Sequence, residues 1–133
     1  MKHSILYLIC IWIGIPVSVP AQTASDTSGQ PYTDITVGEF EALMQQDSVI
    51  ILDVRTPKET SAGMIAGAIG IDVLAQDFAD RINMADTNRT YLVYCRSGHR
   101  SVRACEILAA LGFNSLYNLK GGYTAWRKQD RGH

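Results

Sequence analysis

The chain has 133 residues, a formal net charge of −1, and charges of both signs spread along its length. No basic tract indicates a nucleic-acid partner, and no acidic run forms a tail. The length fits one folded domain, which we expect to be a monomer.

The first 21 residues have the pattern of a secretory signal peptide. A short polar start precedes an almost wholly apolar run from Ile5 to Val17, and Val19-Pro20-Ala21 supplies small residues at the cleavage position. The apolar run is short for a bilayer, which takes about 20 residues, and a retained N-terminal membrane anchor is the alternative. We therefore predict export, to the periplasm in a bacterium, with no stable membrane span after the leader at 1–21 is cleaved.

Helical and strand-like patterns alternate after a linker. Residues 22–31 are rich in Ser, Thr, Gly and Gln, as flexible linkers are, which leaves a domain over 32–133. The expected strands are 32–35, 49–54, 68–71, 91–94 and 115–119, and the expected helices begin at Thr36 and cover 72–84, 101–111 and 123–128, with a loop or single turn at 57–62. In the helix at 72–84, Leu74, Phe78 and Ile82 are expected to face inward. This alternation predicts an α/β domain with a mainly parallel sheet and helices on both faces.

The most informative segment runs from Tyr91 to Ser101. An apolar strand ends at Cys95, and a short loop then leads into a helix. Backbone N–H groups in such a loop favour an anion, and Arg96 and Arg100 add positive charge. All of these features favour a thiolate, which is the nucleophilic form of cysteine. The alternative is that Cys95 is a buried structural cysteine.

The other loop residues have simpler expected roles. Gly98 permits a backbone conformation or a close approach that a Cβ would block. Ser97 and Ser101 are hydrogen-bond donors, although Ser101 could instead cap the helix. His99 is expected to be an exposed loop residue, because a thiolate that is already formed needs no general base.

The second cysteine of the mature chain, Cys105, is expected to pack in the core. About ten helical residues, a rise of about 15 Å, separate it from Cys95, whereas a disulfide needs Cα atoms within about 7 Å. We therefore predict no disulfide. No His/Cys cluster has metal-ligand spacing and no nucleotide-binding Gly-rich loop is present in the sequence, so neither a metal nor another cofactor is predicted.

Three segments together resemble the rhodanese-like domain family of sulfurtransferases. The loop from Cys95 to Arg100 is similar to the active-site loop of that family. The segment from Leu52 to Ile69 contains Asp-x-Arg and Gly-x-Ile-x-Gly-Ala-Ile, as the first family signature does, and the segment from Asn118 to Trp126 resembles the closing signature. The chain departs from the usual pattern at Thr60, Met64 and Ala66, which lie in the first signature and not in the loop.

The resemblance implies sulfur transfer through a persulfide. Cys95 would take a sulfane sulfur from a donor such as thiosulfate and pass it to cyanide, a small thiol or a protein thiol. Arg96 and Arg100 would hold the anionic donor, and Asp53 and Arg55 would lie beside the loop, as an ion pair or brace rather than in contact with substrate.

Two other functions remain open at this stage. One is a module that carries or delivers sulfur without catalysis. The other is an oxyanion enzyme, because phosphatases and arsenate reductases of the same fold use a Cys-x5-Arg loop. The loop from Cys95 to Arg100 is one residue shorter than that, so it forms a smaller cradle that favours a single sulfur atom.

Overall fold

The computed structural model describes residues 29–132. The predicted leader at 1–21 and most of the predicted linker lie outside the described residues. The elements in chain order are β1 (Thr33–Ile35), α1 (Val37–Met44), β2 (Val49–Asp53), α2 (Pro57–Ser61), β3 (Ile69–Gly70), α3 (Phe78–Ile82), β4 (Thr90–Tyr94), α4 (His99–Ala110), β5 (Leu116–Leu119) and α5 (Gly122–Asp130). No helix among these residues is long and apolar enough to cross a membrane.

The five strands form one sheet in the order β1-β5-β4-β2-β3, and every neighbouring pair is parallel. The predicted α/β class and parallel sheet are confirmed. The central strand β4 is buried on both faces, which explains its continuous apolar sequence. The carboxyl ends of β4 and β2 lie side by side, since Tyr94 pairs with Asp53 in the ladder.

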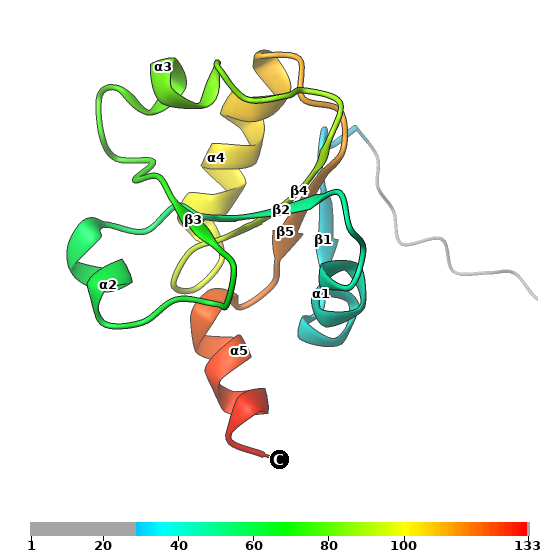
Figure 1. The fold of residues 1–133 in the computed structure, drawn as a ribbon, viewed down its shortest axis with the longest axis vertical. Helices are drawn as coiled ribbons and strands as arrows, with labels where there is room; N and C mark the ends of the chain where they lie inside the picture. The colour runs from blue at the N-terminus through cyan, green and yellow to red at the C-terminus, as the bar shows by residue number, and fades with distance from the viewer. Residues whose placement is uncertain (1–28, 133) are drawn as a thin grey trace, which may run out of the picture.

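Helices cover both faces of the sheet, as predicted. One core contains Phe78 and Ile82 of α3 and Leu108 of α4, and the other contains Phe40 of α1 with Trp126 of α5 packed against it. Figure 1 shows α4 and α1 on opposite sides of the sheet, and α5 extending away from it. The two cores hold the sheet in place, and the loops at its carboxyl edge remain accessible.

A capping box is present at Thr36, where a helix was predicted to begin. The Thr36 hydroxyl accepts a hydrogen bond from the Glu39 amide at 3.3 Å, and the Glu39 carboxylate accepts one from the Thr36 amide at 2.8 Å. These two bonds satisfy N–H groups that would otherwise lack partners at the start of a helix.

The helix predicted over 72–84 is wrong in extent. Only Phe78–Ile82 is helical, and Leu74, which was expected to face inward, is 57% exposed. The Asp72 side chain accepts a hydrogen bond from the Leu74 amide at 2.8 Å, which forms a local turn that competes with a helix. The inward positions of Phe78 and Ile82 are confirmed.

Candidate active site

Cys95 lies directly after β4, at the bottom of the loop that begins α4. Its side chain is buried, with 1% of its surface exposed. The loop turns at Gly98, whose φ of 102° lies in the left-handed region that glycine tolerates. A Cβ at this position would also lie 3.4 Å from the Gly121 amide nitrogen. The predicted need for glycine in the loop is therefore confirmed.

Two donors point at the sulfur atom of Cys95. The Gly98 amide lies 3.1 Å from Sγ, and the Ser101 hydroxyl lies 3.3 Å from it. Burial raises the pKa of the Cys95 thiol, but hydrogen bonds from the Ser101 hydroxyl and from the amides of Ser101, Gly98 and Ser97 outweigh burial, so the net pKa is lowered. The site thus favours a thiolate mainly through short-range donors.

Ser101 is a donor to the sulfur and not a helix cap. Helix α4 begins two residues earlier than predicted, at His99, with Gly98 at the N-cap position. Ser101 therefore lies within the first turn, where its buried hydroxyl faces Cys95. The alternative of a capping role for Ser101 is wrong.

The start of α5 holds the backbone of the cysteine loop. The Tyr123 amide donates to the Cys95 carbonyl at 2.8 Å, and the Thr124 amide donates to the Arg96 carbonyl at 3.0 Å. A Cβ at Gly122 would lie 2.5 Å from the Cys95 carbonyl oxygen, so only glycine allows this approach. The sequence showed only that this segment resembles the closing family signature, and the contact between the two segments was missed.

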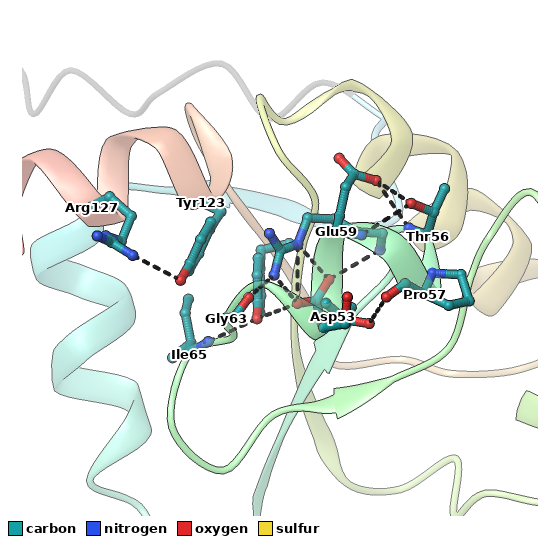
Figure 2. A network of polar contacts seen from close by, with 12 residues as sticks. Asp53, Thr56, Pro57, Glu59, Gly63, Ile65, Tyr123 and Arg127 are labelled. Carbon is teal, nitrogen blue, oxygen red and sulfur yellow. Dashed lines mark hydrogen bonds and ion pairs between the residues drawn. The ribbon is translucent and has the colours of Figure 1, made fainter.

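Asp53 and Arg55 form a buried ion pair beside the loop, as expected. The Asp53 carboxylate accepts from Arg55 Nη2 at 2.7 Å and from the Tyr94 hydroxyl at 2.6 Å. The same hydroxyl accepts a hydrogen bond from the Ile65 amide at 3.0 Å. Arg55 in turn donates to the Gly63 carbonyl at 2.7 Å. Figure 2 shows this network linking β2 to the segment after α2.

The Arg55 guanidinium also stacks on an aromatic ring. Its central carbon lies 4.1 Å from the centre of the Tyr123 ring, and the Tyr123 and Tyr94 rings are stacked with their centres 6.1 Å apart. Arg55 therefore connects the carboxyl end of β2 to the helix that braces Cys95. Tyr123 and Tyr94 are supporting residues whose roles the sequence pattern did not indicate.

Arg100 is paired with a carboxylate. Its two terminal nitrogens each donate to an oxygen of Glu59 at 2.7 Å. The ion pair with Arg100 and hydrogen bonds from Thr56 lower the pKa of Glu59 to about 2, although partial burial opposes the shift. Arg100 thus braces the loop against α2, and its guanidinium is already engaged by a carboxylate.

Three loop side chains are exposed, namely those of Arg96, Ser97 and His99. The Ser97 hydroxyl lies 3.3 Å from His99 Nδ1, and His99 occupies the exposed position that was expected. Arg96 lines a cavity of about 480 Å³ together with residues of α5. Arg96 is therefore the loop cation that a soluble anion can reach.

Cys105 lies in the core and forms no disulfide with Cys95, as predicted. Burial raises its pKa to about 12, so its thiol stays protonated at neutral pH. Across residues 29–132, no group of three or more His, Cys, Asp or Glu side chains could hold a metal ion.

Comparison with known families assigns the domain. The family model described as Rhodanese-like domain matches residues 36–129. The chain belongs to this family. The rhodanese-like domain includes every strand and helix described above except β1 and the last residue of α5.

Two named relatives are about one-third identical to this rhodanese-like chain over the residues that align. A protein named Sulfurtransferase from Allochromatium vinosum is 34% identical over 88 residues, which cover 66% of this chain and 80% of the relative. Thiosulfate sulfurtransferase GlpE from Pseudomonas fluorescens is 36% identical over 87 residues, covering 65% and 77%. The crystal structure of a rhodanese-like domain protein from Staphylococcus aureus has a TM-score of 0.63 and 35% identity, covering 71% of this chain and 90% of that one.

Proposed function

We propose that this protein is a sulfurtransferase that moves a sulfane sulfur from thiosulfate to a thiophilic acceptor. In the first half-reaction, the Cys95 thiolate attacks the outer sulfur of thiosulfate. The sulfur–sulfur bond of thiosulfate breaks, sulfite leaves with its electron pair, and Cys95 becomes a persulfide. In the second half-reaction, cyanide or a thiolate attacks the outer sulfur of the persulfide, and Cys95 leaves as a thiolate.

The observation that carries this proposal is the set of donors around the Cys95 sulfur. The Gly98 amide and the Ser101 hydroxyl stabilise negative charge on Sγ, which is both the attacking group of the first step and the leaving group of the second. The relatives from Allochromatium and Pseudomonas, which are named sulfurtransferase and thiosulfate sulfurtransferase, support the same chemistry.

Steady-state kinetics test the proposal. With thiosulfate and cyanide as substrates, thiocyanate formation should give the parallel double-reciprocal lines of a ping-pong mechanism. Cys95→Ser should abolish the reaction. Cys105→Ser is the matched control and should retain the reaction, because Cys105 lies in the core and not in the cysteine loop. Retained activity in Cys95→Ser, or hydrolysis of an aryl phosphate faster than thiocyanate formation, would overturn the assignment.

We also propose that the protein is exported, on the basis of the leader pattern in residues 1–21. Expressed in a bacterium, the mature protein should be recovered outside the cytoplasm with an N-terminus near Gln22. N-terminal sequencing and fractionation check this, and a full-length cytosolic product would contradict it.

A further inference from the structure

A basic cavity lies next to the cysteine loop, and beyond Arg96 its cations serve no step of the mechanism above. Its volume is about 480 Å³, which is within the range of known ligand sites. Arg96 enters it from the loop, and Arg127, Lys128 and Arg131 enter it from α5 and the residue after it. We call these four side chains the basic cavity cluster.

Few carboxylates oppose the positive charge of the basic cavity cluster, although Asp130 lies close enough to act on Arg127. Among the described residues, the recorded ion pairs are Arg55–Asp53 and Arg100–Glu59, and neither involves the cluster. Glu59 is the only carboxylate that lines the cavity, and its two oxygens are already engaged by Arg100. Since the whole chain has a net charge of −1, the cavity is a local concentration of positive charge.

The basic cavity cluster is spread along α5 over a length greater than that of a thiosulfate ion. Thr124 contacts the loop through its amide, and Lys128 and Arg131 follow it on the same helix face at spacings of four and seven residues. The rise from Thr124 to Arg131 is about 10 Å. An extended peptide of about three residues has the same length and would therefore match the cluster. Figure 2 shows the Arg127 side chain reaching back toward the Tyr123 hydroxyl, so the cations begin close to the loop.

We propose that the basic cavity cluster docks the sulfur acceptor, and that the acceptor is a protein segment in which acidic residues lie within about three positions of the acceptor cysteine. This inference rests on the proposed sulfur transfer and defines its second half-reaction. The acceptor thiolate attacks the outer sulfur of the Cys95 persulfide, the persulfide S–S bond breaks, and Cys95 leaves as a thiolate. The acceptor departs as a persulfide.

Two capped hexapeptides test the docking. One has a single cysteine followed, after a glycine, by three acidic residues, and in the other Asn and Gln replace the acids. The full chain is first loaded with sulfur from thiosulfate, and the rate constant for discharge to each peptide is then measured and corrected for its thiolate fraction. At low ionic strength we expect a preference of about tenfold for the acidic peptide, which electrostatic steering readily produces.

The preference should depend on where the charges lie. Lys128→Gln combined with Arg131→Gln should reduce the ratio of the two rate constants to near one, as should high salt. The control combines Arg81→Gln and Arg103→Gln, which removes the same net charge from exposed positions on α3 and α4 and should retain the ratio. Equal ratios in the wild type and in the Lys128/Arg131 variant, or an equal loss in the control, would overturn the proposal.

Equilibrium binding separates this proposal from the proposed function. The acidic peptide with serine in place of cysteine should bind the unloaded chain, and the Lys128/Arg131 variant should bind it several-fold more weakly. If the acidic peptide binds but no persulfide forms, the docking site is supported and the proposed sulfur transfer is contradicted. If the persulfide forms but the wild type and the Lys128/Arg131 variant bind the peptide equally, only the docking site is contradicted.

Discussion

Gly122→Ala should disrupt the site through the backbone. The added Cβ would lie 2.5 Å from the Cys95 carbonyl oxygen and 2.6 Å from the Arg96 carbonyl carbon, and both are backbone atoms that cannot rotate away. Gly122 also has a φ of 58°, which disfavours a residue with a Cβ. Relief of the clash requires that α5 and the cysteine loop move apart.

The two effects can be summed. The left-handed conformation costs about 1–2 kcal/mol for a residue other than glycine, and forcing an atom into a packed region typically costs about 1–3 kcal/mol. A total of about 2–5 kcal/mol corresponds to a fall of about 10 °C or more in the melting temperature of a domain of this size. Gly112→Ala is the matched control, since Gly112 has a φ of 94° but no atom within 4 Å of a Cβ.

Thermal unfolding and thiocyanate formation measure the two consequences. Gly112→Ala should lose about 1–2 kcal/mol of stability and retain its rate of sulfur transfer. Gly122→Ala should lose more stability and, at temperatures where it remains folded, should transfer sulfur at least tenfold more slowly because the donors around Cys95 are displaced. If Gly122→Ala unfolds and reacts like Gly112→Ala, the close contact between α5 and the loop does not position the nucleophile.

Three further predictions concern the charges and donors of the loop. Ser101→Ala should raise the pKa of the Cys95 thiol and slow its alkylation at neutral pH by about tenfold, the effect of losing one hydrogen bond to a charged group; an unchanged pH profile of alkylation would contradict this. The ion pair lowers the pKa of Glu59 from 4.5 to about 2. The stabilisation that the ion pair gives to the fold is therefore complete above pH 4.5 and is lost as the pH falls toward 2. Glu59→Gln lacks this ion pair, so its melting temperature should fall less over that interval than that of the wild type. Arg96→Ala should slow the reaction with thiosulfate while changing the free energy of unfolding by no more than about 0.5 kcal/mol. Arg96→Lys should restore only part of the rate, because an ammonium lacks the planar pair of donors of a guanidinium. Wild-type kinetics in Arg96→Ala would show that Arg96 is only a solvated charge.

The sequence predicted those parts of the site that depend on local pattern. The apolar run before Cys95 placed the nucleophile at the carboxyl end of a strand, and the short loop before the helical pattern indicated N–H donors around it. The role of Gly98 was predicted because a turn of this kind needs a residue without a Cβ. These features depend on periodicity and on backbone conformation, which neighbouring residues determine.

Contacts between distant segments were not predictable from the pattern. Arg100 and Glu59 are 41 residues apart, and nothing local shows that they form an ion pair. The approach of Gly122 to Cys95 likewise depends on how β4 and β5 lie in the sheet. Leu74 was assigned to a helix by spacing alone, although the Asp72 side chain favours a turn that exposes it.

The most direct test of the account is the mass of the full chain after reaction with thiosulfate followed by removal of the excess. The account predicts a gain of one sulfur atom, located on the peptide that contains Cys95, with one sulfite released per chain and with complete reversal on addition of cyanide. The adduct should be absent from Cys95→Ser and present in Cys105→Ser. An adduct that persists in Cys95→Ser, or a chain that gains no sulfur from thiosulfate, would contradict the central claim.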